Sequence, residues 1–121
     1  MMEKKIINTI YLENGLILSI YDESRKIAGD RWQVNLTAVI QILTGQVQFT
    51  RIDPKKRFEV IQTVGEQIHY EKKLIKNFVA DKEKEEIVLA LSGSFLQNTK
   101  SYLSHRQFAE RFVLKCYADS L

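Results

Sequence analysis

The chain has 121 residues, 45% of them hydrophobic, and its 18 basic and 15 acidic side chains leave a formal net charge of +3. This length and composition predict a single globular domain, residues 1–121, that buries a core of its own. With 27% charged residues, one proline and five glycines, the composition excludes a disordered or low-complexity chain, and the net charge by itself does not indicate nucleic-acid binding.

The cysteine content and the first residues predict a chain that is not exported. Its one cysteine, Cys116, cannot form a disulfide within the chain, and the first five residues, MMEKK, contain no apolar secretory segment. The longest apolar run, residues 87–91, is far shorter than the roughly 20 residues that a membrane-spanning helix needs. We therefore expect a cytoplasmic location of the bacterial type and no membrane partner.

The N-terminal part predicts a β-hairpin. Residues 5–12 and 16–21 read KIINTIYL and LILSIY, and Asn14-Gly15 lies between them. Two β-branched runs around an Asn-Gly pair favour a tight primed turn, in which both central residues take a positive φ. On the second strand Ile17, Ser19 and Tyr21 share one face, opposite that of the intervening leucines and isoleucine.

Residues 31–42, RWQVNLTAVIQI, predict the central strand. Large side chains recur at every second position, and this is the period of a strand with one buried face: Trp32, Val34, Leu36, Ala38, Ile40 and Ile42. The preceding residues 22–30, DESRKIAGD, predict a covering loop or a bulged continuation of the hairpin. A meander of three antiparallel strands follows from this order.

The segment after Ile42 predicts an edge strand and a helix. Weak alternation at Val47, Phe49 and Ile52 indicates a short edge strand that ends before Asp53-Pro54. Asp53 can cap a helix over residues 54–64, Pro54 suits its first position, and Gly65 suits its end. Three apolar residues share one face of this helix: Phe58, Ile61 and Val64.

Residues 67–79, QIHYEKKLIKNFV, fit two structures. A strand would place Ile68, Tyr70, Leu74 and Phe78 on one side, whereas a helix would give only an incomplete apolar stripe. The break at Gly65 and the many β-branched and aromatic residues favour the strand.

Two helices are expected at the C-terminal end. The acidic start at Asp81 and the helical spacing of Ile87, Leu91, Phe95 and Tyr102 predict a helix over about residues 82–102, in which Gly93 would make a close contact with the sheet. Residues 104–107, SHRQ, have the form of a capping box and predict a second helix over residues 105–117, with Phe108, Phe112 and Cys116 as its apolar stripe. The expected fold class is α+β, with an antiparallel β-meander of three to five strands and two C-terminal helices packed on one face.

One loop combines the residue types of a ligand site. Arg25 and Arg31 could bind a phosphate or carboxylate, with Asp30 beside them, while Trp32 stacks on a ring of the ligand. The alternative is structural: Asp22 and Ser24 bond their own backbone, Asp30 pairs with a neighbouring arginine, and Trp32 anchors the core. Acids in turns and buried tryptophans favour the structural interpretation.

A second candidate site lies in residues 67–79. Lys72, Lys73 and Lys76 around Tyr70 and Phe78 could follow a nucleic-acid backbone while the rings stack on bases. The alternative is an edge strand that its lysines protect against aggregation.

The remaining reactive residue types predict no catalytic chemistry. His69 and His105 do not stand at metal-ligand spacing, Cys116 belongs to an apolar stripe, and no phosphate-binding loop or hydrolase motif occurs. We expect no metal and no cofactor, and an enzyme is the least favoured of three function classes. The favoured function is a non-catalytic binding or assembly module that forms a homo-oligomer or binds a protein partner through Ile17, Tyr21 and Val39, and the alternative is weak binding of a nucleic acid or nucleotide.

Overall fold

The core is built on one long strand, β4 (Arg31–Leu43). The computed structural model describes residues 4–121, and in it the even-numbered side chains of β4 from Val34 to Ile42 are at most 1% exposed. The alternation predicted for this segment is confirmed. Burial of each of its large aliphatic side chains contributes about 1.5–3 kcal/mol to folding.

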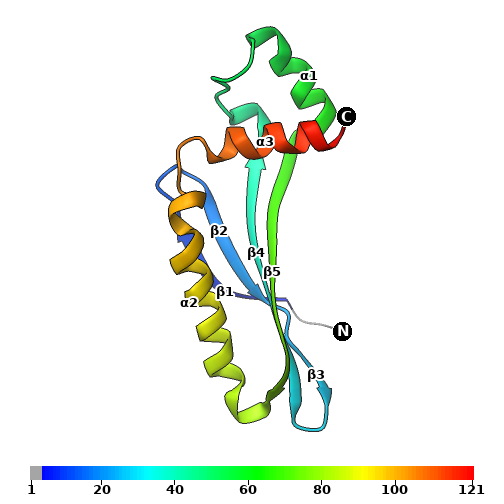
Figure 1. The fold of residues 1–121 in the computed structure, drawn as a ribbon, viewed down its shortest axis with the longest axis vertical. Coiled ribbons are helices and arrows are strands. Elements are labelled where there is room, and N and C mark those ends of the chain that lie inside the picture. Colours follow the sequence, from blue (N-terminus) through cyan, green and yellow to red (C-terminus); the bar gives the residue numbers. More distant parts are fainter. Residues whose placement is uncertain (1–3) are drawn as a thin grey trace.

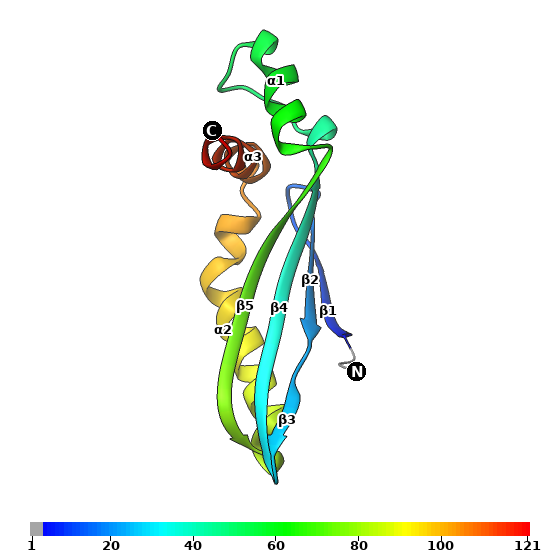
Figure 2. The ribbon, with the colours of Figure 1, turned by 90° about the vertical axis from the view of Figure 1, so that its right-hand side faces the viewer.

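Four further strands complete one antiparallel sheet. β1 (Lys5–Tyr11) pairs with β2 (Ile17–Asp22), and β2 pairs with one edge of β4. The short strand β3 (Arg25–Ala28) continues along that edge, while β5 (Gln67–Ala80) pairs with the other edge over its whole length (Figure 2). The predicted meander, the bulged continuation before β4 and the strand after Gly65 are all confirmed.

The helices cover one face of this sheet. α2 (Lys84–Leu103) lies along the face, and α3 (Phe108–Asp119) crosses the end of the sheet on the same side, beside α1 (Pro54–Val64) (Figure 1). Val88, Phe95 and Leu103 of α2 join Phe108 and Val113 of α3 in the core. The expected α+β fold is confirmed. No helix in the described part of the chain is both long and apolar enough to cross a membrane.

α1 begins and ends where the sequence predicts. The Asp53 carboxylate accepts a hydrogen bond from the Lys55 amide at 2.9 Å, Pro54 is the first helical residue, and Gly65 follows the helix with a φ of 95°. The predicted apolar face is wrong in one respect: Phe58 is 72% exposed, whereas Val60 is fully buried. The contact with α3 decides which face of α1 is covered.

The β1–β2 hairpin is confirmed, but its predicted turn type is wrong. Only Gly15 has a positive φ, of 88°, and its amide donates to the Leu12 carbonyl at 3.0 Å. This is the three-residue loop in which an ordinary turn is followed by a glycine bulge. Asn14 instead donates its side-chain amide to the carbonyls of Leu103 and His105, at 2.8 and 3.0 Å, and so ties the hairpin to the end of α2.

The edge strand expected at residues 47–52 is absent from the described structure. A short 3-10 turn (Thr44–Gln46) and an irregular segment take its place. The Glu110 carboxylate of α3, only 3% exposed, accepts hydrogen bonds from the Thr50 amide at 2.8 Å, the Thr50 hydroxyl at 2.9 Å and the Arg51 amide at 2.8 Å. These bonds satisfy backbone groups that a strand would have paired elsewhere.

Three further expectations about the helices are wrong. α3 begins at Phe108 and not at His105, and the buried Ser104 hydroxyl has no hydrogen-bond partner, so the capping box does not form. Tyr102 is 56% exposed, whereas its neighbour Leu103 is the residue of α2 that enters the core at this point. Gly93 is exposed, and a Cβ added to it would meet no atom within 4 Å, so nothing in the structure explains this glycine.

In β5, Phe78 leaves the apolar side that was predicted for it. It is 74% exposed and has a φ of 57°. The register between β4 and β5 shifts at this point, where Val34 faces Lys76 and Trp32 faces Val79. The resulting bulge turns Phe78 away from the core.

We expect Glu110→Gln to lower the free energy of unfolding at pH 7 by about 2 kcal/mol, since the bonds of a charged acceptor are lost. Burial acts to raise the pKa of Glu110, but the hydrogen bonds from Arg51 and Thr50 outweigh it and lower the pKa below its usual value. A carboxyl group whose pKa is lower in the folded than in the unfolded state stabilises the fold fully at pH values above the unfolded pKa. This stabilisation is lost as the pH falls through the folded pKa.

The difference between wild type and variant should therefore shrink as the pH falls below the usual carboxyl value of 4.5. Urea unfolding at a series of pH values measures it. Glu66→Gln, at an exposed position, is the matched control, and equal effects of the two substitutions at every pH would contradict the prediction.

Candidate binding surface

One face of the sheet carries no helix from residues 4–121, and we call it the open face. It carries the odd-numbered side chains of β4, with Ser19 and Tyr21 of β2 beside Val39 and Thr37. On the other edge of β4, from Asn35 onwards, odd-numbered residues pair with odd-numbered residues of β5, so the odd-numbered side chains of β5 also lie on this face. A groove of about 970 Å³ passes over the open face, and the residues that line it include Lys4, Ser19, Tyr21, Val39, Gln41, His69 and Glu71.

Exposed apolar side chains gather where β1 and β2 meet the open face. Ile6 lies opposite Tyr21, and Tyr11 lies opposite Ile17, with a polar pair, Thr9 and Ser19, between them. Ile6 is 49% exposed, Tyr11 77% and Ile17 45%. We call these six residues the β1–β2 strip. Val39 lies beside Ser19, so the three residues predicted to form an interaction patch, Ile17, Tyr21 and Val39, are on one face.

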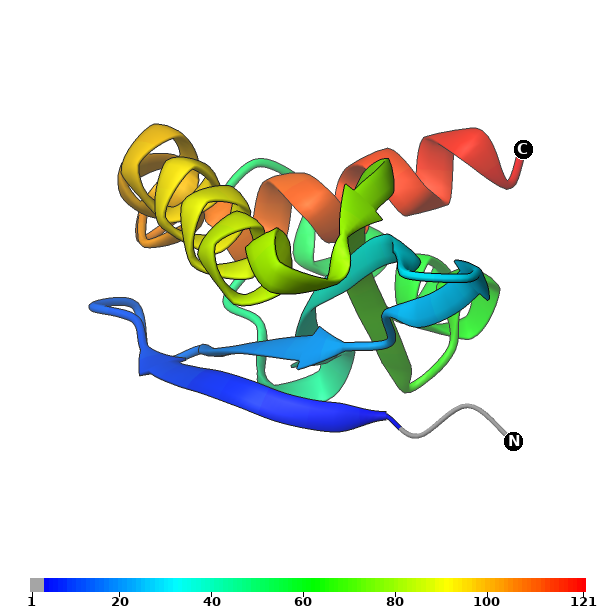
Figure 3. The same cartoon turned by 90° about the horizontal axis from the view of Figure 1, so that it is seen from below.

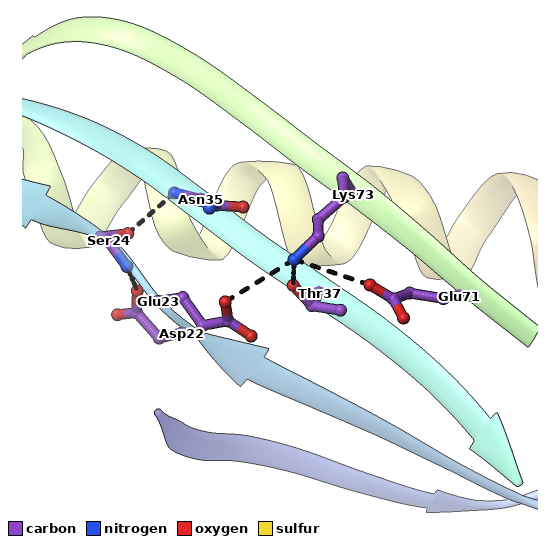
Figure 4. A network of polar contacts seen from close by, with 7 residues as sticks. All are labelled: Asp22, Glu23, Ser24, Asn35, Thr37, Glu71 and Lys73. Atoms are coloured by element: carbon purple, nitrogen blue, oxygen red, sulfur yellow. Dashed lines mark hydrogen bonds and ion pairs between the residues drawn. The ribbon is translucent and has the colours of Figure 1, made fainter. Parts of the chain in front are cut away.

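A polar cluster occupies the centre of the open face (Figure 4). Lys73 of β5 donates to the Thr37 hydroxyl of β4 at 2.8 Å, and its ammonium is 3.6 Å from both the Glu23 and Glu71 carboxylates. Thr37 is only 2% exposed, so water has little access to its hydroxyl. Lys73 supplies the hydrogen bond that this hydroxyl would otherwise lack. Lys73 thus links β5 across β4 to the end of β2.

The charges on the open face are mixed in sign. Lys73 lies between two carboxylates, and the Lys4 ammonium lies 4.4 Å from the centre of the Tyr21 ring. A nucleic acid needs a patch of one sign, whereas mixed charges around apolar residues are typical of protein–protein contacts.

The structure places Trp32 at the junction of β4 and α2. Its indole nitrogen donates to the Asp81 carboxylate at 2.6 Å, and the Lys84 ammonium lies 4.1 Å from the ring centre. Lys26 approaches the same ring at 5.9 Å. The indole therefore already has protein partners at its nitrogen and over its ring.

The other three residues of this predicted ligand site lie at the β3–β4 hairpin. Arg31 pairs with Asp30 at 3.1 Å, and both side chains are exposed, so the pair contributes little to stability. Arg25 faces Gln33, and Arg31 faces Ala28, which puts the two arginines on the open face while Trp32 faces Lys26 on the other. The structure does not bring the arginines and the indole together on one face, and ligand binding here stays a prediction.

The predicted nucleic-acid residues are also divided between the two faces. Tyr70 packs edge to face against Phe108 and Phe112, with ring centres 5.7 Å apart in both pairs, and its burial raises its pKa. Lys72 lies opposite Ala38 and Lys76 opposite Val34, on the helix-covered side, whereas Lys73 is on the open face. The four side chains do not form a common stacking and phosphate-binding surface.

The reactive side chains outside the open face are in structural settings. Burial and, after it, the carboxylate of Asp119 raise the pKa of the half-buried Cys116 thiol, which keeps it protonated at neutral pH. His105 accepts a hydrogen bond from the Gln107 amide at 3.1 Å. Residues 4–121 contain no group of three or more His, Cys, Asp or Glu side chains arranged to hold a metal ion.

Sequence reasoning did not find the Lys73 cluster. Its partners, Glu23 and Thr37, are 50 and 36 positions away in the chain. The only signal that could have found it is the strand register, since pairing residue 37 with residue 73 brings the hydroxyl and the ammonium together.

The comparisons with known proteins give no family for this chain. No protein-family model matches it, and neither a characterised protein nor a solved structure proved similar to it. Interpretation of the surface therefore depends on its residues alone.

We expect Thr37 and Lys73 to be energetically coupled, because removing the lysine leaves a buried hydroxyl without a partner. A double-mutant cycle with Thr37→Val and Lys73→Met, followed by urea unfolding, should give a coupling energy of about 1 kcal/mol. Lys72→Met, one position away on the opposite face, is the control and should show no coupling to Thr37→Val. A coupling indistinguishable from zero for Lys73 would show that its bond to Thr37 does not persist in solution.

Proposed function

We propose that this chain is a non-catalytic assembly module whose β1–β2 strip packs against a second copy of the same chain. The observation that carries the proposal is the exposure of Ile6, Tyr11 and Ile17 along β1 and β2, on a face that no helix of the described chain covers. Apolar side chains gathered on a surface are typical of interaction sites. Self-association through one patch is the commonest form of protein assembly.

The mixed charge of the open face supports a protein partner over a nucleic acid. Lys73 is held by Glu23 and Glu71, so no free row of ammonium groups follows the groove there. A second copy brings an equally mixed surface, and a two-fold arrangement can place unlike charges opposite each other.

Native mass spectrometry and sedimentation over a wide range of protein concentrations test the proposal. We expect a dimer for the wild type and at least a tenfold weaker association for Ile17→Lys, because an ammonium would be buried in the interface. Leu89→Lys is the matched control, because Leu89 is 74% exposed and lies on α2, away from the β1–β2 strip. This variant should remain dimeric.

Circular dichroism must show that both variants keep the fold. A wild type that stays monomeric at every concentration, or equal weakening by the two lysines, would overturn the proposed function.

A further inference from the structure

The two edges of the sheet differ in how they are protected. The free edge of β5 carries Glu71, Lys72, Lys73 and Lys76, and the bulge at Phe78 distorts it. Charged side chains and bulges are the usual means by which proteins prevent pairing at a sheet edge. β5 thus has the features of an edge that does not bind another strand.

β1 has less of this protection: its one irregularity lies between Ile6 and Asn8, and its one charged residue is Lys5 at the start of the strand. Residues 6–12, IINTIYL, are uncharged and rich in β-branched residues, and β1 has no strand beyond it in the described part of the chain (Figure 3). Its pairing with β2 is irregular near Ile7 but regular from Asn8 to Tyr11. A regular, uncharged edge strand is a template for a further strand.

We infer that β1 of one molecule pairs antiparallel with β1 of a second copy, so that two sheets join into one across a two-fold axis near Thr9. This inference rests on the proposed self-association and adds its geometry. It also explains the position of the β1–β2 strip, because Tyr11 and Ile6 of each copy would then flank the new junction on the open face.

The apolar side chains of β1 are complementary in this arrangement. Ile6 and Tyr11 lie on the open face on either side of Thr9, and they are 49% and 77% exposed. The register shift between Ile6 and Asn8 adds one residue on that side of Thr9, so an antiparallel pair centred on Thr9 places Ile6 beside the partner's Tyr11. Each of these exposed side chains then has an apolar neighbour on the other copy.

Disulfide cross-linking tests this register. Directly opposed residues of an antiparallel pair have Cα atoms about 4.5–5.5 Å apart, which is within the span of a disulfide. In a Cys116→Ser background, Thr9→Cys should form a covalent dimer under mild oxidation, at least tenfold more than Ile75→Cys. Ile75 is the matched control, since it is 52% exposed on the open face but lies on β5.

An introduced charge pair tests the pairing without relying on a cysteine. Ile6→Lys and Tyr11→Glu should each weaken dimerisation at least tenfold, and the double variant should recover most of this loss, because each new lysine then lies beside the partner's new glutamate. Sedimentation measures this, with circular dichroism as the check of folding.

The outcomes separate the two proposals. A dimeric wild type with a Thr9→Cys cross-link and recovery of association in the Ile6→Lys/Tyr11→Glu double variant supports the inference. A dimer that Ile17→Lys disrupts, but without the Thr9→Cys cross-link or with equal cross-linking at Ile75→Cys, overturns the β1 pairing and leaves the assembly function. A monomeric wild type overturns both.

Discussion

The architecture depends on the burial of one face of β4. Val34, Leu36, Ala38, Ile40 and Ile42 are withdrawn from water there, and every layer of the molecule contributes to covering them. β2 and β3 on one edge and β5 on the other satisfy the backbone groups of β4, while α2 and α3 cover its apolar side. A strand paired on both edges can be buried in this way without unsatisfied amides.

Polar side chains then hold the covering layer in place. Asn14 joins the β1–β2 hairpin to the last carbonyl of α2, Glu110 holds the segment after β4 against α3, and the Trp32 indole bonds to Asp81 just before α2. All three connect elements at the ends of the sheet. The helices are therefore fixed on one face, and this one-sided arrangement leaves the other face to solvent or to a partner.

The open face differs in polarity between its two edges. Near β5 it carries the Lys73 cluster, whose charges satisfy one another and a buried hydroxyl. Near β1 it carries exposed apolar side chains beside an edge strand that is uncharged after Lys5. Water solvates the first region well and the second poorly, so association at β1 would cost little desolvation of charge. This asymmetry is the physical basis of the assembly role that we propose.

The sequence by itself determined what local spacing controls: the alternation of β4, the hairpin at Asn14-Gly15, and α1 with its Asp53 cap. Tertiary structure decided the rest. Residues 47–52 could have formed a strand, but the Glu110 carboxylate, 60 positions from Thr50, binds their amides instead. Phe58 and Phe78 match the apolar patterns of their elements, yet contacts between α1 and α3 and the bulge in β5 expose both. Periodicity follows from backbone geometry, which neighbouring residues share, whereas the choice of partner depends on groups that meet only after the chain has folded.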